Sequence, residues 1–112
     1  MQVTMGVKMG RNRLPAAMAA LEQRATQAVA KAAQDTLSDA VQRAPIDTGN
    51  LRASGYARPS SRFVWRVGFT AGYAAYVELG TSRMRAQPYL VPAWVAGRYR
   101  LMQALRRVGL FG

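Results

Sequence analysis

The sequence contains no cysteine and no histidine. These two absences exclude disulfide bonds, zinc sites built from Cys and His, cysteine nucleophiles and a Ser-His-Asp triad. Acidic residues are scarce as well: five Asp and Glu occur in 112 residues, so acid–base catalysis has few groups to use. We therefore expect a protein that is not an enzyme and that holds no cofactor and no metal.

Long apolar runs are also missing. No apolar stretch approaches the ~20 residues of a membrane-spanning helix, and the first residues, MQVTMGVKMGRNR, lack the apolar core of a signal peptide. We expect neither a membrane segment nor secretion. The length of 112 residues is typical of one domain over 1–112. Because a domain of this size buries only ~65% of its unfolded surface, a partner subunit would add useful stability.

Positive charge is abundant: 16 Lys and Arg against five acidic residues give a net charge of +11, and fourteen of the sixteen are arginine. The guanidinium fork suits phosphates and carboxylates, which favours contact with nucleic acid or an acidic protein surface. The alternative is that arginine reflects a coding bias and keeps the surface soluble. No helix-turn-helix, zinc finger or aromatic RNA-binding motif accompanies the charge, so we expect no reading of DNA sequence.

Hydrophobic periodicity in the first half predicts a strand followed by a long helix. Residues 2–9 alternate apolar and polar side chains, which is typical of a half-buried strand. Residues 14–44 are rich in alanine, with apolar positions three and four apart, which predicts a helix. Pro15 suits its first turn and Pro45 ends it. Asp47-Thr48-Gly49 then favours a defined turn.

The second half predicts a hairpin and a second helix. Residues 51–57 are a weak strand, 58–61 a loop and 62–70 the strongest strand, which together predict an antiparallel hairpin over about 51–70. Residues 73–79 fit a short helix or a strand that ends at Gly80, and 82–87 fit an exposed basic loop. Residues 92–108 fit a helix. The sequence thus predicts an α+β fold, with a small, mainly antiparallel sheet packed against the long N-terminal helix and a C-terminal helix.

Two groups of acidic residues are candidates for a special role. Glu78 lies between Val77 and Leu79, and a buried carboxylate needs a cationic or hydrogen-bonding partner. We predict Arg52 as that partner in a structural ion pair; a contact across a subunit boundary or a catalytic role is the alternative. Asp35 and Asp39 lie one helical turn apart, and we expect a solvated face there rather than a metal site.

Basic and aromatic residues gather in the last third of the chain. The loop 82–87 is either solvated or an arm that orders against a neighbouring subunit or DNA. Of four aromatic residues, we expect two in the core and the others at an interface, where aromatic residues and arginine are enriched. The four are Tyr73, Tyr76, Tyr89 and Trp94.

Four features, in chain order over about residues 14–108, resemble the small tail-component family of long-tailed bacteriophages, whose members are called neck, head–tail joining or tail-completion proteins. They are the long helix that ends before Asp47-Thr48-Gly49 and Leu51-Arg52, the strand Phe63 to Phe69, the stretch from Tyr73 through Tyr76-Val77-Glu78 to Gly80-Thr81, and the segment Gln87 to Ala93. The motif residues are Pro45, Asp47, Thr48, Gly49, Leu51, Arg52, Tyr73, Tyr76, Glu78, Gly80, Thr81, Pro88 and Pro92.

The resemblance implies a structural virion protein that assembles in the host cytoplasm. Its expected place is a homo-oligomeric, six-fold ring at the head–tail neck, which links the capsid connector to the tail, surrounds the DNA path and contacts other neck and tail proteins. The alternatives are a tail terminator that caps the tail tube and a sequence-independent nucleic-acid-binding protein. Candidate interface or DNA-lumen contacts are Arg83, Arg85, Tyr89, Trp94, Arg98, Arg100, Arg106 and Arg107.

Overall fold

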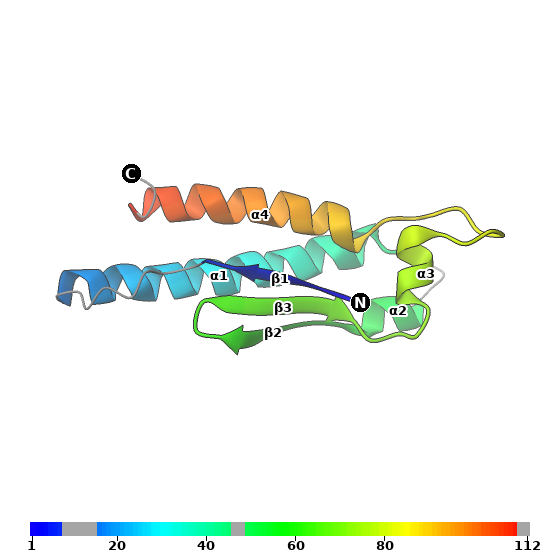
Figure 1. Ribbon diagram of the computed structural model, residues 1–112, viewed down its shortest axis with the longest axis horizontal. Helices are drawn as coiled ribbons and strands as arrows, with labels where there is room; N and C mark the ends of the chain where they lie inside the picture. Colours follow the sequence, from blue (N-terminus) through cyan, green and yellow to red (C-terminus); the bar gives the residue numbers. More distant parts are fainter. Residues whose placement is uncertain (8–15, 46–48, 110–112) are drawn as a thin grey trace.

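The computed structural model describes residues 1–7, 16–45 and 49–109, and over this part the chain forms an elongated α+β fold of about 56 × 22 × 20 Å (Figure 1). The fold class is therefore the predicted one. The elements of the described part, in order, are β1 (Gln2–Gly6), α1 (Ala16–Arg43), α2 (Gly49–Ala53), β2 (Gly55–Ser61), β3 (Val64–Phe69), α3 (Ala74–Leu79) and α4 (Leu90–Arg107).

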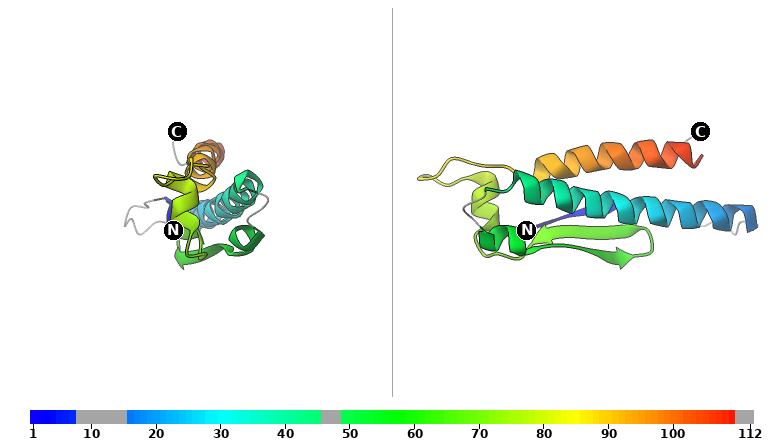
Figure 2. Two further views of the ribbon diagram at one scale, coloured as in Figure 1. Left: turned by 90° about the vertical axis from the view of Figure 1, so that its right-hand side faces the viewer. Right: turned by 180° about the vertical axis from the view of Figure 1, so that it is seen from behind.

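The three strands form one antiparallel sheet in the order β1-β3-β2. Alternate residues point toward α1, as the period of two requires, and Met5, Val67 and Phe69 are buried there. The strand predicted over 62–70 is thus confirmed as β3. Figure 2 shows the sheet on one side of α1, with α4 packed along another. Over the described residues, the opposite face of the sheet is not covered by a helix.

Helix α1 lines the core with small side chains. The buried positions of its described side chains are Ala25, Val29, Ala32, Ala33, Thr36 and Ala40. Because these side chains are short, α4 approaches α1 closely. The two helices are in close contact at Gly97, where an added Cβ would overlap the Thr36 hydroxyl. A glycine is therefore required in the middle of α4, although glycine lowers helix propensity.

The predicted hairpin is partly wrong. Residues 49–53 form helix α2 rather than the start of a strand, because the Ser54 N–H donates to the Asn50 and Leu51 carbonyls and Leu51 is buried. Strand β2 then runs through the residues 58–61 expected to form a loop. Pro59 is tolerated there because β2 is an edge strand, and the register shifts between Pro59 and Ser61.

The last third follows the prediction more closely. The segment predicted at 73–79 is a helix, α3, over Ala74–Leu79, and the Gly80 that follows it has a φ of 76°, which favours glycine. The loop 82–87 is exposed, and its end is fixed by the Gln87 N–H, which donates to the Val77 carbonyl at 2.8 Å. Helix α4 begins at Leu90 rather than at residue 92.

Several predictions fall outside the described residues. The end of the first strand at 8–9, the start of the long helix at 14–15, and Asp47 and Thr48 belong to this group. Among the helices that are described, none combines the length and apolar character needed to cross a bilayer. Nor do the described side chains gather three or more acidic metal-ligating groups at one place.

Candidate assembly surface

Glu78 holds the N-terminal end of α4. Its side chain is buried, and Oε1 accepts the backbone N–H groups of Tyr89 at 3.3 Å and Leu90 at 2.8 Å. Oε2 accepts the Val91 N–H at 3.3 Å. The first N–H groups of a helix have no intrahelical partner and form its positive end. The Glu78 carboxylate therefore satisfies these donors and fixes where α4 begins, which explains the early start at Leu90.

Arg52 caps the C-terminal end of α1 in the same way. Its Nε and Nη2 donate to the Ala44 carbonyl at 3.1 and 2.7 Å, and Nη2 also lies 3.4 Å from the Gln42 carbonyl. These carbonyls have no partner within the helix. The predicted Glu78–Arg52 ion pair is therefore wrong. Each charged side chain instead caps the end of a different helix, which residue spacing alone does not reveal.

Tyr89 belongs to the core. The residue is fully buried, its ring packs edge-to-face on Phe69 with centroids 4.9 Å apart, and its hydroxyl donates to the Ala74 carbonyl at 3.0 Å. Burial, together with the negative charge of Glu78, raises the pKa of Tyr89 to about 12. The candidate role of Tyr89 as an interface contact is therefore wrong, because no part of its side chain is accessible. Tyr89 and Glu78 instead attach α3 to the start of α4.

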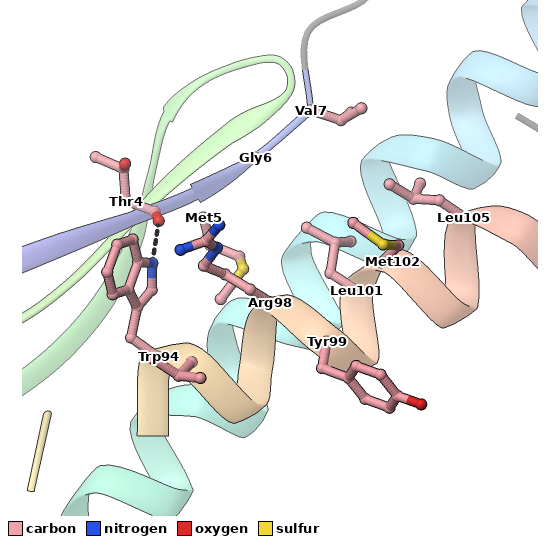
Figure 3. Close-up of a pocket in the computed structure, with 11 residues that line it drawn as sticks. Thr4, Met5, Gly6, Val7, Trp94, Arg98, Tyr99, Leu101, Met102 and Leu105 are labelled. Carbon is pink, nitrogen blue, oxygen red and sulfur yellow. Dashed lines mark hydrogen bonds between the residues drawn. The ribbon is translucent and has the colours of Figure 1, made fainter. Parts of the chain in front are cut away.

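An open groove of about 680 Å³ runs between β1 and α4 (Figure 3). At one end, the Trp94 indole N–H donates to the Thr4 carbonyl at 2.8 Å. The Arg98 guanidinium lies 4.7 Å from the centre of the Trp94 ring, a cation–π distance. The groove is otherwise apolar. Its lining residues are Thr4, Met5, Gly6 and Val7 from the β1 side and Trp94, Val95, Arg98, Tyr99, Leu101, Met102 and Leu105 from α4.

Helix α4 carries more apolar surface than the core uses. One face packs on α1 through buried residues such as Leu101 and Leu105. A second face is exposed, at spacings of four, four and three residues, and borders the groove. A helix that is apolar on more than one face is normally buried on each of them. We call this second face the α4 apolar face; its residues are Val91, Val95, Tyr99 and Met102, between 40% and 67% exposed.

A second exposed apolar group lies on and next to α3. Leu79 is 72% exposed and Tyr76 60%, and the neighbouring Tyr73 is also exposed. Figure 1 shows α3 at one end of the long axis, beyond the start of α4, whereas the groove runs along the side of the molecule. The described part of the chain thus presents two different apolar surfaces, and Tyr73 and Tyr76 are exposed at the second.

The candidate arginines do not form one surface. Arg83 and Arg85 are exposed in the loop after α3, and Arg98 lies in the groove. Arg100 and Arg107 are exposed on α4, and the Arg106 guanidinium lies 3.8 Å from the Met102 sulfur.

Each carboxylate among the described residues has a hydrogen-bonding or ion-pair partner. Asp35 pairs with Lys31 at 2.7 Å, Asp39 with Arg43 at 2.9 Å and Glu22 with Arg62 at 3.3 Å, while Glu78 caps α4. The pairs at Asp35 and Asp39 are the ones expected of a solvated helix face. Most exposed arginines in the described part therefore have no carboxylate partner.

The other motif residues shape the connections between elements. Pro45 follows α1, Gly49 begins α2, and Pro92 lies in the first turn of α4, where its missing N–H costs little. Thr81 and Pro88 are exposed in the loop between α3 and α4.

Comparison with known proteins gives one family. The family described as "Bacteriophage HK97-gp10, putative tail-component" matches residues 12–80. The matched region contains α1, the described strands β2 and β3, and α3 with Glu78. No curated protein and no solved structure gives a significant match to the chain.

Proposed function

The chain belongs to the HK97-gp10-like family of bacteriophage tail components, and from this we propose that it is a subunit of a ring at the head–tail neck of the virion. As a tail component it contacts other phage proteins. The ring would be six-fold, link the capsid connector to the tail and surround the DNA path. The observation that carries this proposal is the presence of two separate exposed apolar surfaces, one on α4 and one on α3.

Two surfaces favour a ring over a symmetric dimer. A two-fold dimer uses the same patch twice, whereas a closed ring needs two different patches that complement each other. The α4 apolar face borders an open groove, and α3, which carries exposed Leu79 and Tyr76, lies at one end of the molecule (Figure 1). We propose that α3 of one subunit packs against α4 of the next. The Glu78 cap would then fix the angle between the two surfaces within each subunit.

We also propose that the protein is not an enzyme and holds no cofactor. The chain lacks histidine and cysteine. The carboxylates of the described part bind arginine, lysine or backbone N–H groups.

The proposal is tested first in a phage that lacks this gene, by electron microscopy of the lysate. We expect DNA-filled heads beside separate, finished tails. Overlong tail tubes would overturn the neck-ring proposal and support the tail-terminator alternative. Intact, infectious virions would overturn a structural role.

The surfaces are tested by complementing that phage with variants. Val95→Glu places a charge on the α4 apolar face and should prevent both self-association, measured by sedimentation velocity, and the joining of heads to tails. Leu79→Glu should do the same from the α3 side. Gln34→Glu is the matched control, because it adds the same charge at an exposed position on α1. Equal behaviour of Val95→Glu and Gln34→Glu would contradict the proposed contact.

A further inference from the structure

We propose that the uncovered face of the sheet binds the phosphate backbone of duplex DNA without reading its sequence. This site is separate from the α4 apolar face and goes beyond the assembly role. It lies across all three strands, on the side away from α1 (Figure 2). We call it the outer sheet face; its polar residues are Gln2 and Thr4 on β1, Arg66 on β3, and Tyr56 and Arg58 on β2.

The strand register places these residues in two rows. Thr4 pairs with Arg66, and Arg66 pairs with Arg58, so one row crosses the sheet with two adjacent guanidinium groups. Gln2 and Tyr56 both pair with Gly68 in the next row. Both arginines are exposed. The polar side chains therefore stand on one open surface, held by backbone pairing rather than by a flexible loop.

The two arginines are an unfavourable pair in the isolated subunit. Like charges directly opposite each other on neighbouring strands destabilise a sheet. No carboxylate within the hairpin offsets this repulsion, because residues 49–77 contain no Asp or Glu. The Arg58 guanidinium lies 4.3 Å from the centre of the Tyr56 ring, which holds it over the sheet. An anion bound between Arg58 and Arg66 would turn this repulsion into attraction.

The side chains of the outer sheet face suit phosphate. Contacts to the DNA backbone come from Arg, Thr, Gln and Tyr side chains, which are the types present here. Arginine and tyrosine also occur at protein interfaces, but the large exposed apolar side chains that form the core of such an interface lie on α3 and α4 rather than on this face. On the outer sheet face, Val64 is the aliphatic residue, and it is half-buried.

The second row, which contains Gln2, Gly68 and Tyr56, keeps the outer sheet face flat. The Tyr56 hydroxyl donates to Gln2 Oε1 at 2.8 Å and thereby crosses β3 at Gly68, where an added side chain would collide with it. A side chain at position 68 would lift this row, whereas glycine lets a phosphate backbone approach the two arginines. The chemistry favours nucleic acid over an acidic protein surface.

The test compares three double variants that each remove two positive charges. They are Arg58→Gln with Arg66→Gln on the sheet, Arg83→Gln with Arg85→Gln in the loop, and Arg100→Gln with Arg107→Gln on α4. Binding to a fluorescein-labelled duplex of mixed sequence is measured by anisotropy between 50 and 200 mM NaCl, with folding checked by circular dichroism. The concentrations span the range over which phosphate contacts lose most of their affinity, about 50 to 200 mM.

We expect the sheet variant alone to reduce the steepness of the plot of log binding constant against log salt concentration. The magnitude of the slope should fall by about two, one for each lost phosphate contact. Replacing both arginines with lysine should retain most of the slope, since the charge remains. Equal reductions of the salt slope in all three double variants would mean that net charge alone drives binding, and would overturn the site. A larger reduction in the loop or α4 variant than in the sheet variant would overturn it too. Absence of DNA binding by the unaltered protein would overturn it as well.

Polyglutamate serves as a second probe. Binding of polyglutamate as tight as that of DNA, and lost in the same sheet variant, would assign the face to an acidic protein and overturn the nucleic-acid proposal. The sheet variant should still join heads to tails in the complementation assay, so failure of this inference is distinguishable from failure of the assembly role.

Discussion

The Glu78 carboxylate accepts the Leu90 backbone N–H at 2.8 Å, and through this bond a six-residue helix fixes the start of an 18-residue one. The bond joins α3, which carries exposed Tyr76 and Leu79, to α4, which carries the α4 apolar face. Within each subunit, this buried carboxylate and the Tyr89 hydroxyl, which donates to the Ala74 carbonyl, connect the two surfaces that are proposed to meet between subunits. Its loss should disturb both stability and assembly.

Glu78→Gln should lower the free energy of unfolding by about 2 kcal/mol. The substitution replaces one acceptor oxygen with an NH₂ group that faces backbone N–H donors, and hydrogen bonds to charged groups contribute about 1.5–3 kcal/mol. Urea unfolding followed by tryptophan fluorescence measures the loss. The matched control is Glu22→Gln, whose partly exposed pair with Arg62 at 3.3 Å should contribute at most about 1 kcal/mol. Equal losses in the two variants would contradict the capping role.

Arg52→Lys should destabilise the end of α1 even though the charge is kept. Lysine cannot reproduce the two bonds that the Nε and Nη2 atoms make with the Ala44 carbonyl. We expect a loss of about 1 kcal/mol in urea unfolding and faster amide exchange in the last turn of α1. Arg107→Lys, at an exposed position on α4, should change neither quantity. Unchanged exchange in Arg52→Lys would argue against the cap.

Gly97→Ala should destabilise the protein by about 1–3 kcal/mol, because the new methyl group would overlap the Thr36 hydroxyl where α4 packs on α1. Helix propensity alone predicts the opposite sign. Adding Thr36→Ala should restore part of the loss, which a double-mutant cycle measures. Gly72→Ala is the control, since nothing lies within 4 Å of an added Cβ there, and it should be close to neutral.

Stability should fall in alkali because of Tyr89. Its pKa in the folded protein is raised to about 12, from 10.0 in the unfolded chain, so the folded state retains the proton longer. The contribution is complete below pH 10 and is lost as the pH rises from about 10 to about 12. The difference in unfolding free energy between the unaltered protein and Tyr89→Phe should therefore shrink over this range. A constant difference between pH 9 and 12 would contradict the shifted pKa.

Local patterns were sufficient for the elements whose periodicity is strong. Residues 62–70 and 14–44 contain a clean period of two and of 3.6, and β3 and α1 lie within them. The predictions for 51–53 and 58–61 are wrong because α2 is short and because a proline in an edge strand resembles a loop signal, whereas 55–57 are in a strand as predicted. Turn and edge positions depend on neighbours that are distant in sequence.

The sequence by itself determined the α+β class, the long alanine-rich helix, the exposed basic loop and the excess of arginine, since each depends on composition or on spacing within one segment. Only the tertiary structure decided the partners of the charged groups. Glu78 and Arg52 carry opposite charges, yet each hydrogen-bonds the unpaired backbone groups at a helix end instead. The same holds for the two arginines of the outer sheet face, which lie eight residues apart in the chain and become neighbours only through strand register.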